Sequence, residues 1–157
     1  MQAKIQTYTD VDIHTAYEMI NNHTLYPDLL ILDVREQYEY DENHLYNAML
    51  IPLGDIDTRY TELIPYNDTG ILVYCRTGGR SAVASENLAV NHNFTKIYNM
   101  LGGIIDWIAA GYPVWIGDNG EGQSSIGFSL TLFIIVIFGT MGIILIHYKK
   151  YRSQNKN

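Results

Sequence analysis

Residues 126–146 form a run of 21 residues, IGFSLTLFIIVIFGTMGIILI, that contains no charged side chain. About 20 apolar residues are enough for a helix to cross the hydrocarbon core of a bilayer. A buried helix of a globular domain is rarely this long or this uniformly apolar. The run therefore predicts one C-terminal transmembrane helix, and the 125 residues before it leave room for a single domain with its own core.

The segments on either side of this run complete the predicted organisation. Residues 117–125 (GDNGEGQSS) are small, polar and rich in glycine, which is typical of a flexible linker. The last eleven residues contain four lysines or arginines. We therefore expect a globular domain at 1–116, a linker at 117–125, a transmembrane helix at 126–146 and a basic tail at 147–157.

Charge is distributed unevenly along the chain. Residues 1–125 hold all 17 acidic residues and six of the ten basic ones, a net charge of −11. Such a domain has no basic stripe to neutralise phosphates, so we expect no nucleic acid among its partners. The bilayer is the partner that the apolar run predicts.

Two sequence signals disagree about the side of the membrane on which the domain lies. Basic residues beside a membrane span are typical of a cytoplasmic flank, so the tail favours a single-pass protein with its domain outside the cytoplasm. However, the first 20 residues lack the apolar core of a signal peptide. A domain on the cytoplasmic face, anchored by its C-terminus, therefore stays open.

Short apolar segments alternate with helical patterns before residue 117. The expected strands cover residues 29–32, 48–51, 71–74 and 96–99, and the expected helices cover residues 11–21, 55–63, 81–91 and 104–110. We expect Asp10 or Thr9 to cap the first helix. This alternation predicts an α/β fold with a mainly parallel sheet, in which ligands bind at the carboxyl ends of the strands.

The single cysteine, Cys75, follows the strand expected at 71–74 and precedes a glycine-containing loop and a helix. Backbone N–H groups of the loop and the N-terminus of the helix would surround the thiol with positive potential. Arg76 and Arg80 add two positive charges nearby. Each of these effects favours the thiolate, so we expect the pKa of Cys75 to be lowered.

Such an anion-binding loop suits three tasks: attack on a sulfur donor, attack on a phosphate ester, or simple anion binding. Six residues run from Cys75 to Arg80, and a tetrahedral phosphoryl group would need a wider loop. The plain alternative is an inert buried cysteine, because a free cysteine usually behaves as a small hydrophobic residue.

The segment 71–81, ILVYCRTGGRS, resembles the active-site loop of the rhodanese-like sulfurtransferases. Other segments resemble signatures of the same family in the same order: residues 32–35 with Glu39 and Tyr40, His44 with Ala48 and residues 51–52, residues 101–103 with Trp107, and residues 111–114. The resemblance spans about residues 8–114. It departs at Asn43, where the family usually has glycine, and this puts the local turn geometry in doubt.

The resemblance implies a rhodanese-like α/β domain with a central, mainly parallel sheet of about five strands flanked by helices. It implies that Cys75 is the catalytic residue and cycles between thiolate and persulfide. It also implies a substrate-binding loop that receives a small anionic donor such as thiosulfate and passes sulfur to a thiol or protein acceptor. The loop residues are Arg76, Thr77, Gly78, Gly79 and Arg80.

Two other functions remain open beside the sulfurtransferase. One is a non-catalytic, membrane-anchored persulfide carrier or partner-binding module. The other is a phosphatase or arsenate reductase, although phosphatases that resemble this fold have a loop one residue longer. We expect no metal and no other cofactor, because the histidines show no ligand spacing with one another or with the cysteine.

Asp33 and Arg35 are expected to lie close to this loop, since they follow a predicted strand. Arg35 and Glu39 are four residues apart and would pair on one helical turn. We interpret these residues as parts of the scaffold.

Overall fold

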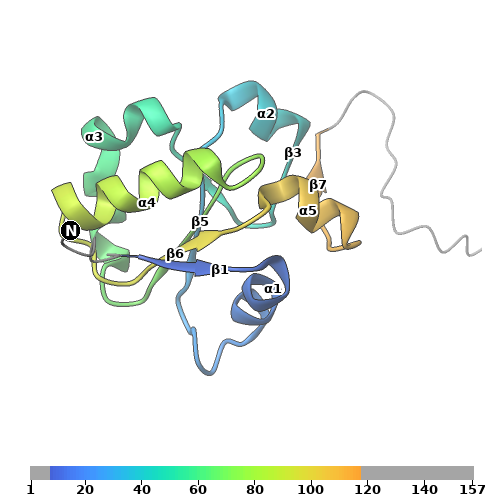
Figure 1. Ribbon diagram of the computed structural model, residues 1–157, viewed down its shortest axis with the longest axis horizontal. Helices are drawn as coiled ribbons and strands as arrows, with labels where there is room; N and C mark the ends of the chain where they lie inside the picture. The colour runs from blue at the N-terminus through green and yellow to red at the C-terminus, as the bar shows by residue number, and fades with distance from the viewer. Residues whose placement is uncertain (1–7, 118–157) are drawn as a thin grey trace, which may run out of the picture. The chain divides into compact units, whose positions relative to one another are not determined.

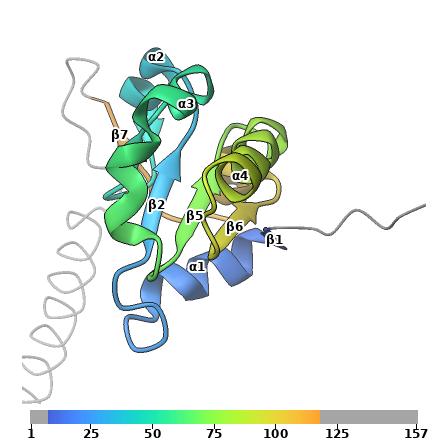
Figure 2. The same cartoon turned by 90° about the vertical axis from the view of Figure 1, so that its left-hand side faces the viewer.

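The structure is a computed structural model, and it describes residues 8–117. The centre of this domain is a five-stranded sheet in which every neighbouring pair of strands is parallel. Figure 2 shows its strands running side by side. In spatial order the strands are β1 (Thr9–Val11), β6 (Ile97–Met100), β5 (Ile71–Tyr74), β2 (Leu30–Asp33) and β4 (Met49–Leu50). The predicted α/β fold with a parallel sheet is confirmed.

Strands β2 and β5 are buried on both faces, as the apolar runs at 29–32 and 71–74 predict. Successive side chains of a strand point to opposite faces. Leu32 and Val73 accordingly belong to one core cluster, whereas Ile31 and Leu72 belong to the other. The sheet therefore separates two cores, and each needs a layer of helices to cover it.

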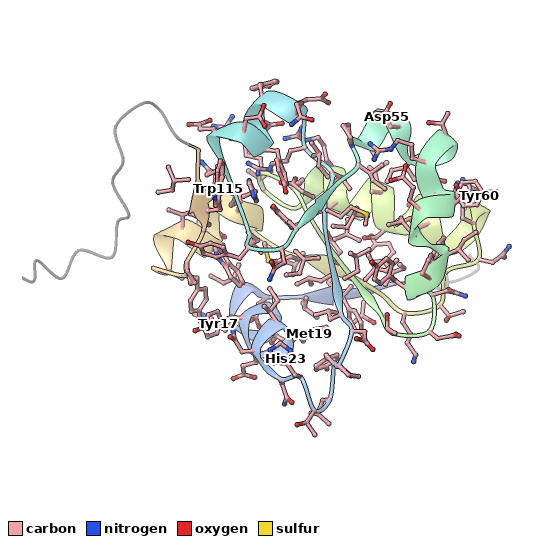
Figure 3. The ribbon with its side chains drawn as sticks, turned by 180° about the vertical axis from the view of Figure 1, so that it is seen from behind. Tyr17, Met19, His23, Asp55, Tyr60 and Trp115 are labelled. Atoms are coloured by element: carbon pink, nitrogen blue, oxygen red, sulfur yellow. The ribbon has the colours of Figure 1, made fainter. Side chains whose placement is uncertain are left out.

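Helices cover both faces of the sheet (Figure 1). On one side α3 (Ile56–Arg59) and α4 (Gly79–Asn91) pack on the first cluster. On the other side α1 (Ile13–Asn21) and α5 (Gly103–Ala109) pack on the second. Figure 3 shows the two sides, with Met19 of α1 below the sheet and Tyr60 above it.

The N-terminal helix begins later than the sequence pattern predicts. Residues Thr9–Val11 form β1, which pairs with β6, and the buried Val11 lies opposite Met100. Asp12 caps α1, because its carboxylate accepts hydrogen bonds from the backbone N–H groups of His14 and Thr15 at 2.9 and 2.8 Å. The prediction of a cap at Asp10 or Thr9 is therefore wrong.

Besides β1, three short elements were not predicted. They are α2 (Gln37–Glu42) and the antiparallel pair of β3 (Asn43–His44) with β7 (Trp115–Ile116). The φ of Asn43 is −163°, which is extended backbone that any residue adopts. Glycine is not required at this position, so the departure at Asn43 does not disturb the turn.

The helix predicted at 55–63 is present as three pieces. The 3₁₀ helix η1 (Leu53–Asp55) leads into α3, and a second 3₁₀ helix, η2 (Tyr60–Tyr66), follows it. Pro65 lies inside η2. Proline has no N–H to donate within a helix, which favours a short, tightly wound end over a longer α-helix.

The described domain forms one compact unit that ends at Gly117. Within residues 8–117, no helix is long and apolar enough to cross a membrane. The transmembrane helix predicted at 126–146, the linker beyond Gly117 and the basic tail at 147–157 lie outside the described residues.

Candidate active site

Cys75 lies at the carboxyl edge of the sheet, directly after β5. Because the strands are parallel, the segments that follow β2 and β6 begin at this same edge. The loop from Cys75 to the start of α4 therefore lies between α2 and the N-terminus of α5, as Figure 1 shows. This is the edge at which open α/β sheets bind their ligands.

Cys75 is only 1% exposed, and hydrogen-bond donors surround its sulfur. The backbone N–H of Gly78 donates to Sγ at 3.2 Å. The hydroxyl oxygen of Ser81 lies 3.5 Å from Sγ and 3.0 Å from the carbonyl oxygen of Gly78. Gly78 has a φ of +96°, a left-handed conformation that other residues rarely adopt. Because residue 78 is glycine, the backbone can turn here, and the N–H groups of the loop can point toward the sulfur.

These donors make Cys75 more acidic than an ordinary cysteine. Burial is the largest single influence and raises its pKa, but hydrogen bonds to the sulfur outweigh it. They come from the Ser81 hydroxyl and from the N–H groups of Ser81, Thr77 and Gly78, and the net effect is a lowered pKa. A buried thiolate that is stabilised by hydrogen-bond donors is suited to nucleophilic attack.

The first residues of α5 form hydrogen bonds with the backbone of the cysteine loop. The N–H of Ile104 donates to the carbonyl oxygen of Cys75 at 2.9 Å, and that of Ile105 donates to the carbonyl oxygen of Arg76 at 3.2 Å. Gly103, with a φ of +60°, makes this approach possible, because a Cβ there would lie 2.5 Å from the Cys75 and Arg76 backbone. The start of α5 is thus fixed against the candidate nucleophile's own peptide.

The two arginines of the loop lie in different surroundings. Arg76 is exposed, and so are Thr77 and Gly79. Arg80 is half-buried and forms a bidentate ion pair with Glu39 of α2, with both N–O distances at 2.7 Å. Glu39 raises the pKa of Arg80 chiefly through these hydrogen bonds, and negative charge on Cys75 adds to the effect. Sequence reasoning placed both arginines at the site but missed the carboxylate that holds one of them.

The pairing expected between Arg35 and Glu39 is absent. Arg35 is buried and binds the carboxylate of Asp33, with Nη2 2.7 Å from Oδ2, and it also donates to the carbonyl oxygen of Asn43 at 2.6 Å. The physical reason is that α2 begins only at Gln37, so the spacing of side chains on a helix does not apply to Arg35.

Sequence reasoning did not assign a role to Ser81. A signal was present, because a serine in the first turn of a helix that follows a cysteine loop can direct its hydroxyl back toward the loop. Among residues 8–117, no group of three or more His, Cys, Asp or Glu side chains is arranged to hold a metal ion.

Comparison with known proteins gives a consistent result. The family model "Rhodanese-like domain" matches residues 12–110. A sulfurtransferase of Allochromatium vinosum is 33% identical over 87 residues, which are 55% of this chain and 78% of that protein. YrkF of Bacillus subtilis, named as a sulfur carrier protein, is 37% identical over 79 residues. The match covers 50% of this chain but only 41% of YrkF.

Solved structures show the same fold. The crystal structure of a rhodanese-related protein from Thermoplasma volcanium is similar, with a TM-score of 0.59 and 31% sequence identity. The similarity covers 69% of this chain and 98% of that structure. The cysteine loop at the carboxyl edge of a parallel sheet thus occurs within a domain whose sequence matches one family over 12–110, and the chain belongs to the rhodanese-like domain family.

Proposed function

We propose that the chain is a sulfurtransferase that carries sulfane sulfur as a persulfide on Cys75. The Cys75 thiolate attacks the outer sulfur of an anionic donor such as thiosulfate, and a new S–S bond forms. The S–S bond of the donor breaks, and sulfite leaves with the electron pair. A thiol or a protein acceptor then takes the outer sulfur, which restores the thiolate.

The observation that carries this proposal is the set of donors aimed at Sγ. The Gly78 N–H at 3.2 Å and the Ser81 hydroxyl at 3.5 Å favour negative charge at this point. A persulfide is likewise anionic, so the same donors stabilise the product of the first step. The exposed Arg76 and the loop's N–H groups are suited to receive the donor.

Mass spectrometry of the intact protein after incubation with thiosulfate tests the proposal. We expect the mass of one added sulfur atom on the wild type and no addition on Cys75→Ser, because serine is too weak an acid to supply the anion. Transfer to a thiol acceptor should then remove the sulfur. Sulfur loading by Cys75→Ser would contradict the assignment of the nucleophile.

A persulfide carrier is the second candidate, and the likeness to a relative named as a sulfur carrier favours it. A carrier would accept sulfur once but release it slowly to small thiols. Multiple turnovers with thiosulfate and a small thiol would distinguish the enzyme from the carrier. Failure to hydrolyse a phosphate monoester would further separate both from a phosphatase.

The sequence also supports a membrane anchor for this domain. In this proposal the apolar residues 126–146 span the bilayer once, and the basic tail places the domain outside the cytoplasm. Labelling of intact cells with a membrane-impermeant thiol reagent tests the side, because Cys75 is the single cysteine. Labelling that appears only after lysis would place the domain in the cytoplasm.

A further inference from the structure

The ion pair between Glu39 and Arg80 changes how much positive charge the loop offers to a donor. Arg80 stands in the first turn of α4, close enough for charge on Cys75 to raise its pKa. Its guanidinium is nevertheless bound through two N–H groups to the Glu39 carboxylate at 2.7 Å. A bidentate pair of this kind is strong and fixes the geometry of both partners.

Glu39 is itself held in place from its own helix. The N–H of Glu36 donates to Glu39 Oε2 at 3.0 Å, and the Glu39 side chain is only 12% exposed. The pKa of Glu39 is lowered, chiefly by the hydrogen bonds from Arg80. Hydrogen bonds from Glu36 and Arg80 therefore hold this negative charge at the loop.

The ion pair lowers the net positive charge that the loop offers to an anionic donor. Arg76 and Arg80 bring two positive charges, and Glu39, which is bound to Arg80, brings one negative charge, so these three groups sum to +1. The exposed carboxylate of Glu36 also acts on Arg80, and its negative charge lowers this sum further. The nearby Asp33 and Arg35 bind each other and add nothing to the sum. Thiosulfate is a dianion, so its charge and that of the Cys75 thiolate sum to −3. With a monoanionic sulfane donor the sum is −2, which is closer in magnitude to the positive charge of the loop.

We infer that Glu39 is a specificity-determining residue that selects sulfane donors with a single negative charge over dianionic donors. The inference rests on the proposed sulfur transfer through Cys75. The negative charge of Glu39 repels an anionic donor, and the free-energy cost of binding grows with each negative charge on that donor. Glu39 acts through Arg80 and through its own field, and it takes no part in bond formation.

Two donors of similar shape differ in charge. Their leaving groups also differ, so the donor ratio of each variant is compared with the wild-type ratio. Methanethiosulfonate, CH₃SO₂S⁻, differs from thiosulfate by a methyl group in place of one charged oxygen. Attack by the Cys75 thiolate on its outer sulfur forms the persulfide and releases methanesulfinate with the electron pair. No oxidant or reductant is needed in either reaction. We expect the wild type to show the higher kcat/KM with methanethiosulfonate.

Glu39→Gln removes the charge and keeps the side chain's size. We expect kcat/KM for thiosulfate to rise by about five- to tenfold relative to that for methanethiosulfonate. The matched control is Glu42→Gln, which removes an exposed charge from the same helix without contacting Arg80. Its donor ratio should stay at the wild-type value.

Arg80→Gln gives an independent test in the opposite direction. It leaves Glu39 without its cation and lowers the positive charge at the loop by one, so kcat/KM should fall more for thiosulfate than for methanethiosulfonate. A wild type that uses thiosulfate as well as methanethiosulfonate would overturn the inference, and so would equal ratios in Glu39→Gln and Glu42→Gln. Absence of sulfur on Cys75 with both donors would instead overturn the proposed function, and this inference with it.

Discussion

Asp33 and Arg35 form an ion pair that is almost completely removed from water. Arg35 Nη2 lies 2.7 Å from Asp33 Oδ2, and the two side chains are 4% and 0% exposed. The same guanidinium donates to the Asn43 carbonyl and lies 5.6 Å from the centre of the Tyr74 ring. The pair therefore joins the end of β2 to β3 and to the strand that leads into Cys75.

Breaking this pair should destabilise the domain strongly. Arg35→Ala leaves the Asp33 carboxylate buried without its cation, and such losses cost about 3–5 kcal/mol. Urea unfolding followed by circular dichroism measures the change. Arg59→Ala is the control, because it breaks the exposed pair with Glu62 and should change stability little. Equal losses in the two variants would contradict a special role for the buried pair.

The sequence predicts the central strands, and the position of Cys75 at the end of one of them, because both depend on local patterns. The apolar run at β5, Cys75 and the following glycines are adjacent in the chain. The partners of the arginines depend instead on tertiary structure, since Glu39 and Arg80 are 41 residues apart. The four-residue spacing of Arg35 and Glu39 suggested a different pair, and only the true start of α2 excludes it.

Short elements escape prediction for a related reason. β1 has three residues and begins with two exposed polar ones, so its pattern does not stand out from a helix cap. It forms because β6 provides a parallel partner. β3 and β7 have two residues each and pair across 70 residues of chain. Whether such short strands form depends on the strands with which they pair in the tertiary structure, and not on the β-propensity of their own residues.

Gly103→Ala should damage the site and the fold together. The new Cβ would lie 2.5 Å from the backbone of Cys75 and Arg76 and would force the start of α5 away from the loop. We expect a loss of stability and slower sulfur loading of Cys75. Gly111→Ala provides the control, because Gly111 also has a positive φ, +79°, but has open space around it. It should lose about 1 kcal/mol of stability from backbone strain alone and should load sulfur normally.

Ser85→Ala should stabilise the domain. Ser85 is completely buried in α4, and its hydroxyl oxygen has no hydrogen-bond partner among the described residues. Removing a buried unpaired hydroxyl, and replacing serine with the residue of highest helix propensity, should together add about 0.5–1.5 kcal/mol to the free energy of unfolding. Urea unfolding checks this value, and a loss of stability would show that the hydroxyl has a partner.

Ser81→Ala should raise the pKa of Cys75. Burial raises this pKa, and the Ser81 hydroxyl is the largest of the influences that lower it. Only the thiolate reacts with an alkylating reagent, so the rate of alkylation should reach half its maximum at a higher pH in the variant than in the wild type. The N–H groups of Thr77, Gly78 and residue 81 remain, so part of the lowering should persist. Ser85→Ala, one helical turn further along α4, is the matched control and should leave the rate profile unchanged. Identical profiles for Ser81→Ala and the wild type would show that the backbone donors alone hold the thiolate.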